Sequence, residues 1–355
     1  MLRKILIAVI IFTGLFFGGV LVLILFYAGD VDKWLSDHSP VDAEILVVEG
    51  WVSGNALEAA GKEFREGNYN YLITTGGPLN EVFNLSRNGY VRFDLAAAGI
   101  EWNSYDTVMI SLFAFGEQAL GEFARYTIIH KDDTIGQGFT EAEMKSYVYA
   151  YSIADRQPDM IRVVFDNDFH IDKDDRNLHI WKLMIGDRTI PVRSEFTSAV
   201  RRQSGNEIVR PLYHETLAEE TAWFLSTAGI DSSRVIPLSV PQVRIFRTYS
   251  DAVAVSEWLK SSGRTFKTVN IFTVGNHARR SLALYRYALP DSVDVGITGV
   301  DRSSFYSSDR LDFSFGRLNT LRQLGAYIYT RVFFNSRWHY KRISDKIEAM
   351  NNSGS

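Results

Sequence analysis

Residues 269–281, V-N-I-F-T-V-G-N-H-A-R-R-S, indicate the fold class of this 355-residue chain. Its first half is rich in apolar β-formers, as expected of a buried strand. Gly275 and Asn276 interrupt that run, and residues 278–289 then have the spacing and composition of a helix. A buried strand that turns directly into a helix predicts an open α/β sheet, in which ligands bind beyond the carboxyl ends of the strands.

His277 and Arg280 follow this strand three residues apart, so they would share a face of the first helical turn. A titratable ring and a permanent cation beside a helix N-terminus suit an anionic ligand. A solvated surface turn would have the same sequence. We treat Asn276 and Arg280 as candidate binding residues, and His277 as a candidate general acid or base.

The composition leaves room for a membrane segment and roughly two domains, at about 150 residues per domain. The net charge of −4 gives no sign of a nucleic-acid-binding protein. The chain has no cysteine, which excludes disulfides and thiol catalysis without fixing the compartment.

Residues 5–27 contain no charged side chain and would span about 35 Å as a helix, enough to cross a bilayer. Arg3 and Lys4 precede this run, whereas Asp30 and Asp32 follow it. The positive-inside rule therefore predicts a single-pass anchor over residues 1–28 of a bacterial inner-membrane protein. The N-terminus would be cytoplasmic and the bulk of the chain periplasmic or extracellular. A signal peptide is the alternative, although the exit from the run lacks a small-x-small cleavage site.

A β-α-β unit opens the predicted α/β domain. Residues 45–48 are an apolar strand ending at Glu49, residues 55–65 have helical spacing, and residues 71–75 form a second strand. This order implies parallel strands joined by a right-handed crossover. Gly76 and Gly77 then allow a backbone to approach a ligand closely, although two glycines after a strand also make an ordinary turn.

Residues 104–195 interrupt the α/β pattern with short alternating segments typical of a β-sandwich. They contain the acidic run D-N-D-F-H-I-D-K-D-D-R-N-L, whose carboxylates repel one another unless they are solvated or bridged by a cation. Hard oxygen ligands suit Ca²⁺, but the central glycine and terminal glutamate of an EF-hand loop are missing. The candidate metal ligands are Asn167, Asp168, Asp172, Asp174, Asp175 and Asn177.

The α/β pattern resumes at Tyr213 and includes R-T-Y-S-D-A, which adds Arg247 and Thr248 to the candidate ligand-binding residues. The predicted fold is therefore a Rossmann-like parallel sheet interrupted by a small β-sandwich and preceded by one transmembrane helix. The expected parts are the anchor over 1–28, a discontinuous α/β domain over 42–100 and 205–335, the insert over 104–195, and a polar C-terminal tail over 341–355.

Four motifs in the α/β portion, I-L-V-V-E-G-W, I-T-T-G-G-P, R-T-Y-S-D-A and F-T-V-G-N-H-A-R-R-S, resemble the YdcF/SanA/ElyC family (domain of unknown function 218). These are bacterial envelope proteins, and an N-terminal single span is usual in the membrane-bound members. The resemblance covers about residues 42–75 and 213–334. The family tends to have a glutamate where this chain has Gln323, so any role of that acid is in doubt here.

Residues 161–186 are similar to the end of the family 60 carbohydrate-binding modules, which are Ca²⁺-dependent xylan binders. The elements F-x-N-D and D-R-N-L carry the similarity, and they favour a calcium site over a solvated loop. The resemblance implies that Asp168 and Asp175 hold a Ca²⁺ whose open positions accept two neighbouring sugar hydroxyls. His170, Trp181 or Tyr149 would then lie beside the sugar, or belong to the core or rim.

Three classes of function fit the sequence. An envelope enzyme would use the strand ends, with Glu49 and His277 catalytic and Gly76, Gly77, Arg247, Thr248, Asn276 and Arg280 binding a phosphate or carboxylate. Alternatively, Arg247 pairs with Asp251 and Glu49 caps a helix, and the α/β domain is a scaffold for a glycan-binding or assembly factor. We expect a membrane-anchored envelope protein of cell-surface polysaccharide or lipid-linked glycan metabolism. Its partners would be a carbohydrate, a phosphate-bearing lipid-linked intermediate and the membrane, with no cofactor assigned to the α/β domain.

Overall fold

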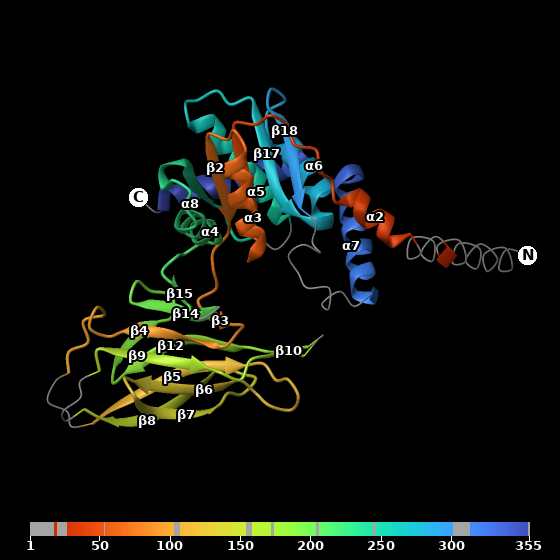
Figure 1. Cartoon of the computed structure of the whole chain (residues 1–355). Helices are drawn as coiled ribbons and strands as arrows, with labels where there is room; N and C mark the ends of the chain where they lie inside the picture. Colours follow the sequence, from red (N-terminus) through yellow and green to blue (C-terminus); the bar gives the residue numbers. More distant parts are fainter. Residues whose placement is uncertain are drawn as a thin grey trace, which may run out of the picture. The chain divides into compact units, whose positions relative to one another are not determined.

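The computed structural model describes residues 18–19, 27–52, 54–102, 107–153, 158–171, 174–203, 206–243, 246–300 and 313–353. The chain divides into two compact units. An α/β unit comprises residues 1–78 and 216–355, and a sandwich unit comprises residues 79–215 (Figure 1).

Five parallel strands form the sheet of the α/β unit, in the order β16-β2-β1-β17-β18. Their bounds are β1 Ile45–Val48, β2 Tyr71–Gly76, β16 Val235–Ser239, β17 Thr268–Val274 and β18 Asp294–Val300. Numbered by their order along this unit, the parallel strands lie side by side as 3-2-1-4-5. The second and third strands are added on one side of β1, and β17 and β18 on the other, so the order of strand addition reverses between β1 and β17. The prediction of a parallel α/β sheet is confirmed, and the reversal marks the crevice where such sheets bind ligands.

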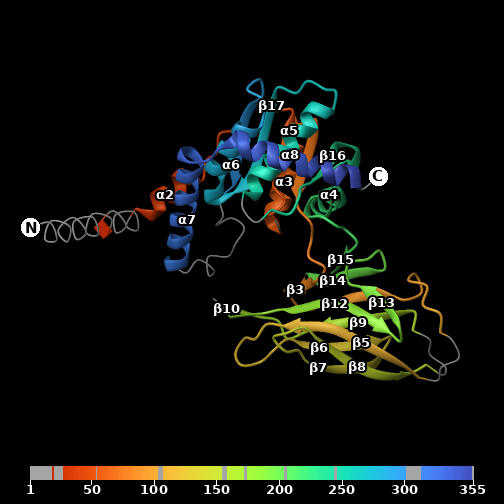
Figure 2. The same cartoon turned by 180° about the vertical axis from the view of Figure 1, so that it is seen from behind.

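Helices cover both faces of this sheet, because its central strand is apolar on both sides. Ile45 and Val47 of β1 belong to one core with α5, α6 and α8, while Leu46 and Val48 belong to another with α3 and α4. Figure 1 shows the α3 face, and Figure 2 shows the opposite face. The helix bounds are α3 Asn55–Glu66, α4 Leu217–Thr227, α5 Arg247–Ser261, α6 Ala278–Ala288 and α8 Ser336–Ser353, with 3-10 turns η1 Ser232–Arg234 and η2 Gly275–His277.

The predicted membrane anchor, residues 5–27, lies almost wholly outside the described residues. The described chain continues as α2, Ala28–Leu35. Among the helices that the structure describes, none is both long enough and apolar enough to cross a membrane.

Within the predicted polar tail over residues 341–355, the described residues 341–353 continue the helix α8. Ile343 and Ile347 lie one helical turn apart and are both buried in the core beside α5. The tail is therefore part of the α/β unit, in which α8 follows α7, Phe313–Val332.

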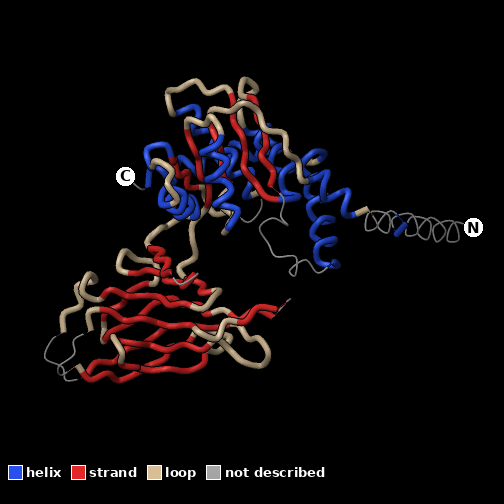
Figure 3. Tube along the Cα trace, viewed as in Figure 1, coloured by secondary structure: helices blue, strands red, loops and turns tan. Residues whose placement is uncertain are grey.

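The inserted unit is a sandwich of two antiparallel sheets, in the orders β13-β12-β5-β8 and β15-β14-β4-β9-β6-β7 (Figure 3). It extends beyond the predicted 104–195 at both ends, because β4 pairs with β9 and β14, and β15 pairs with β14. A two-stranded ribbon, β10-β11, carries the acidic run, and β3 pairs with β12. The bounds are β3 Phe83–Leu85, β4 Gly89–Asp94, β5 Thr107–Gly116, β6 Arg125–His130, β7 Asp133–Phe139, β8 Lys145–Ser152, β9 Met160–Phe165, β10 Phe169–Ile171, β11 Asp174–Arg176, β12 Leu178–Ile185, β13 Arg188–Pro191, β14 Thr197–Gln203 and β15 Asn206–Pro211.

Candidate functional site

The acidic run of the sandwich begins with a side chain that fixes the loop to the neighbouring strand. Oδ1 of Asn167 accepts a 2.7 Å hydrogen bond from the backbone N–H of Arg125, and its Nδ2 donates to the carbonyl of Phe123 at 3.1 Å. The next backbone N–H, that of Asp168, donates to Oδ1 of Asn88 at 2.9 Å. Asn167 therefore positions the loop, and its predicted role as a metal ligand stays a prediction.

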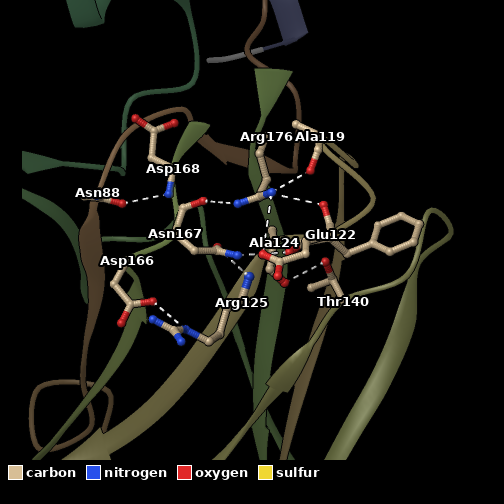
Figure 4. A network of polar contacts seen from close by, with 11 residues as sticks. Asn88, Ala119, Glu122, Ala124, Arg125, Thr140, Asp166, Asn167, Asp168 and Arg176 are labelled. Carbon is tan, nitrogen blue, oxygen red and sulfur yellow. Dashed lines mark hydrogen bonds and ion pairs between the residues drawn. The ribbon is translucent and has the colours of Figure 1, made fainter. Parts of the chain in front are cut away.

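Arg176 holds the other side of the same loop from a buried position. Its guanidinium donates to the backbone carbonyls of Glu122 (3.1 Å), Asn167 (2.8 Å) and Ala119, and lies 3.7 Å from the Glu122 carboxylate (Figure 4). An arginine that satisfies three backbone carbonyls from one plane fixes their relative positions. This organising role was missed from the sequence, although the D-R-N-L element contains the residue.

Asp168 and Asp175 are close enough for each charge to act on the other. Burial, and then the charge of Asp175, raises the pKa of Asp168, while Arg87, His170 and Arg201 oppose that rise. Oδ1 of Asp168 is buried and has no hydrogen-bond partner. Asp175 has His170 beside it, with Nδ1 at 3.1 Å from Oδ1.

The remaining predicted metal ligands have different surroundings. The Asn177 amide donates to the Glu117 carboxylate, which His179 also approaches at 3.3 Å, and Oδ1 of Asn177 is buried without a partner. Asp174 is exposed, and Asp172 lies outside the described residues. Within the described part of the chain, no three acidic or histidine side chains form a complete metal site. The unpartnered oxygen of Asp168, on which the charge of a second carboxylate acts, is a hard ligand of the kind that Ca²⁺ prefers.

Three aromatic groups are candidate sugar-contacting surfaces. His170 is partly exposed beside Asp175. The Tyr149 hydroxyl lies 2.7 Å from that of Tyr126 and its ring packs against the sandwich core, so this side chain is structural. Trp181 lies on the outer face of the β5–β12 sheet, where its ring meets Phe113 edge-on at 6.2 Å and Lys182 at 4.5 Å.

In the α/β unit, Glu49 directly follows β1 and is completely buried. Its carboxylate accepts hydrogen bonds from the hydroxyls of Thr273 (2.6 Å) and Ser281 (2.9 Å) and from the indole of Trp51 (3.1 Å). Burial raises the pKa of Glu49, and the hydrogen bonds and the charge of Arg280 only partly oppose this rise. These contacts connect β1, β17 and α6, which argues against a helix-capping role.

His277 and Arg280 lie together at the same strand ends, as their spacing predicted. Nη2 of Arg280 is 2.9 Å from Nδ1 of His277, and the His277 ring packs on Trp51 with centroids 4.6 Å apart. The Gln323 amide nitrogen is 3.2 Å from Nε2 of His277. Arg280 is attracted to Glu49, so a cation, a carboxylate and an imidazole meet at the β1–β17 reversal.

A second buried carboxyl, Asp251 of α5, was not predicted as a site residue. Burial, and then the charge of Glu49, raises its pKa well above the ordinary value, against the opposing effects of Thr75 and Arg247. Tyr285 is completely buried, and its pKa is raised by burial and by the charges of Asp251 and Glu49, against the opposing effect of Thr75. The sequence signal was available, because Asp251 lies within the R-T-Y-S-D-A motif.

The other predicted α/β residues divide into rim and packing positions. Arg247 begins α5 and acts electrostatically on Asp251, with Thr248 buried beside it. A side chain on Gly76 would lie 2.6 Å from Cβ of Leu217, so this glycine allows α4 to approach. Gly77 lies nearest Val240. Asn276 is buried and donates to Asp32 at 2.7 Å, so its amide holds α2.

Residues 109–198 match the family described as Ca-dependent, xylan-binding carbohydrate-binding modules. Two solved structures are similar at low identity. The first is the selenomethionine form of vCBM60, from work on circular permutation between two calcium-dependent module families (16% identity, 25% of this chain, 65% of that chain, TM-score 0.21). The second is vCBM60 in complex with galactobiose (18% identity, 31% and 89%, TM-score 0.22). No curated protein matches the chain. The family match supports the predicted insert and does not extend to the α/β unit.

Proposed function

We propose that the sandwich unit binds a glycan through a Ca²⁺ held by Asp168 and Asp175. The family match over residues 109–198 carries this proposal. It is supported by the buried, unpartnered Oδ1 of Asp168 beside a second carboxylate, since a divalent cation would relieve both the lost hydrogen bond and the repulsion. When bound, the Ca²⁺ would supply open positions for two neighbouring sugar hydroxyls. Arg176 and Asn167 would keep the loop in the geometry that this requires.

Calorimetric titration of the full chain with xylo-oligosaccharides and with galactobiose, in Ca²⁺ and in a chelator, tests this function. We expect binding only with Ca²⁺, and loss of both Ca²⁺ and sugar binding in Asp175→Ala. Asp187→Ala, an exposed acidic residue in the β12–β13 turn, is the matched control and should bind as the wild type does. Sugar binding that persists in the chelator, or equal loss in both variants, would contradict the proposal.

For the α/β unit we propose an anion-binding site at the β1–β17 reversal. The main support for this proposal is that Arg280 lies beside His277 and is attracted to Glu49, at the strand ends where α/β sheets bind ligands. The likeness of its four motifs to the YdcF/SanA/ElyC family supports an envelope role, with residues 5–27 as the membrane anchor. Together the two sites suit a membrane-anchored protein of cell-surface polysaccharide or lipid-linked glycan metabolism. In the alternative, the α/β unit is a scaffold and only the sandwich binds a ligand.

Titration of the full chain with inorganic pyrophosphate separates these alternatives. Arg280→Ala should abolish binding. The adjacent Arg279→Ala is the matched control, because Arg279 contacts the backbone of Trp34 and the carboxylate of Asp37 instead. No pyrophosphate binding by the folded wild-type chain would favour the scaffold.

A further inference from the structure

Helix α7 has its polar and apolar faces reversed relative to an ordinary surface helix. Three polar side chains, Thr320, Gln323 and Thr330, are only 3–6% exposed. Large apolar side chains of α7 and the turn after it face outward instead. They are Leu318 (63% exposed), Ile328 (47%), Tyr329 (44%), Val332 (66%) and Phe333 (69%). A surface helix normally buries its apolar stripe. Tyr329 stacks on Phe246 with ring centroids 6.0 Å apart, but Leu318, Ile328, Val332 and Phe333 remain exposed within the described chain.

Specific hydrogen bonds fix the reversed orientation. The Thr320 hydroxyl donates to Asp32 of α2 at 2.9 Å, and the Gln323 amide lies against the His277 ring. Rotating α7 to bury its apolar stripe would break these contacts and leave the Asp32 carboxylate with one donor fewer. The exposure of the stripe therefore follows from how α7 is held.

The segment of chain that carries this stripe is basic in sequence. No aspartate or glutamate occurs in residues 318–344, which carry five basic side chains. These are Arg322, Arg331, Arg337, Lys341 and Arg342. Trp338, at the start of α8, is 56% exposed beside them. Outward apolar and aromatic groups bordered by arginine and lysine are typical of a helix that lies in a lipid interface.

The position of α7 in the chain's packing also points to a membrane. It packs on α2 (Figure 1). At this contact Tyr327 meets the ring of Trp34 edge-on, with centroids 5.3 Å apart. Helix α2 begins at Ala28, directly after the uncharged run of residues 5–27. The exposed stripe therefore lies on α7, which packs against α2, and α2 directly follows the most apolar segment of the chain.

We propose that this surface, defined as Leu318, Ile328, Tyr329, Val332, Phe333 and Trp338, lies in the headgroup–acyl boundary of a bilayer that contains anionic lipid. The apolar side chains enter the boundary, and the five basic side chains bind the phosphates of the headgroups. The residues of this membrane contact are not those of the proposed glycan and anion sites, although the charge of Arg322 also acts on Arg280. It would restrain the α/β unit at the bilayer.

The absence of cysteine makes a direct test practical. Val332→Cys and, as a matched control, Lys62→Cys are each labelled with an environment-sensitive fluorophore in the full chain. Lys62 is on α3 with its side chain 69% exposed, which resembles the exposure of Val332. The chain is reconstituted with vesicles of phosphatidylcholine and phosphatidylglycerol, with or without a spin-labelled lipid that quenches fluorescence. We expect the label at 332 to shift to shorter wavelength and to be quenched by the spin-labelled lipid, and the label at 62 to do neither.

Equal spectra at the two positions in vesicle-bound chain would overturn the proposal, as would a chain that fails to float with the vesicles. A disulfide between two unlabelled copies of the Val332→Cys variant, in place of lipid quenching, would also overturn it and would assign the surface to a second copy of the chain. Arg331→Glu with Arg337→Glu should reduce the wavelength shift in mixed vesicles and leave the α/β fold intact, because both residues are exposed. An unchanged shift in this variant would contradict the contribution of anionic lipid.

Discussion

Nη2 of Arg280 lies 2.9 Å from Nδ1 of His277, and this contact fixes the form of the imidazole. A guanidinium only donates hydrogen bonds, so Nδ1 must accept and carries no proton. The proton of the neutral ring is then on Nε2, which faces the Gln323 amide at 3.2 Å. If the Gln323 amide is turned so that Oε1 lies there, Oε1 accepts this proton. The turned amide also gives a donor to Oε1, which is otherwise buried without a partner.

The first prediction concerns this tautomer. In ¹⁵N NMR spectra of the full chain at neutral pH, His277 should show a protonated Nε2 and an unprotonated Nδ1. Arg280→Ala should remove the preference, because Nδ1 then loses its donor. A doubly protonated His277 in the wild type would contradict this assignment.

The second prediction concerns pH and the buried pair Glu49–Asp251. Because the pKa of Asp251 is raised well above its ordinary 3.8, the native state retains a proton that the unfolded state loses. Stability of the α/β unit should therefore fall as the pH rises above about 4, by up to about 1.4 kcal/mol per pH unit, until the folded pKa is passed.

Asp251→Asn should flatten that dependence and raise stability at neutral pH, since an amide cannot ionise. The calorimetric transition of the α/β unit, followed in the full chain from pH 4 to 7, measures both effects. Asp291→Asn, an exposed acid, is the control and should keep the wild-type slope. Parallel slopes in wild type and Asp251→Asn would show that Asp251 is ionised throughout.

The fold was predictable where periodicity was unambiguous. The strand at Thr268–Val274 and the helix at Ala278–Ala288 followed from an apolar run, a glycine break and helical spacing. The ends of the insert were not predictable, because β4 alternates like any half-buried strand and the buried run of β14 begins with two polar side chains, Thr197 and Ser198. Which sheet a strand joins depends on pairing with distant segments such as β9, and composition does not encode that pairing locally.

The candidate sites were predictable as motifs but not as contacts. Residues that follow strands of one parallel sheet meet at one edge, which is why Glu49, His277 and Arg280 gather. Asn167 fixes a loop and Asn276 holds α2, and both roles depend on tertiary hydrogen bonds. The outward orientation of the apolar side chains of α7 was likewise not predictable. A helical wheel shows which residues share a face, but not whether that face points to the core or to solvent.

The third prediction concerns Arg176, which satisfies three backbone carbonyls from a buried position. Arg176→Ala should destabilise the sandwich by about 3 kcal/mol or more, because it leaves the three carbonyls without their donor. Arg125→Ala, which breaks a half-exposed pair with Asp166, should cost about 0–1 kcal/mol. Urea unfolding of the sandwich transition measures both, and equal costs would refute the organising role.

The last prediction concerns the effect of Asp168→Asn on stability, which should have opposite signs with and without calcium. Without Ca²⁺, ionised Asp168 is disfavoured by burial and by Asp175, so Asp168→Asn should unfold at an equal or higher temperature than the wild type. With Ca²⁺ at about 100 times its dissociation constant, the wild type should gain about 2.7 kcal/mol, and Asp168→Asn should gain little. Asp166→Asn is the control, because Asp166 pairs with Arg125 away from this carboxylate pair and should keep the calcium gain. Thermal unfolding of the three full-length proteins, in a chelator and in Ca²⁺, gives the sign in each condition. A wild type that gains no stability from Ca²⁺ would reduce the acidic run to a solvated loop and remove the physical basis of calcium-dependent glycan binding.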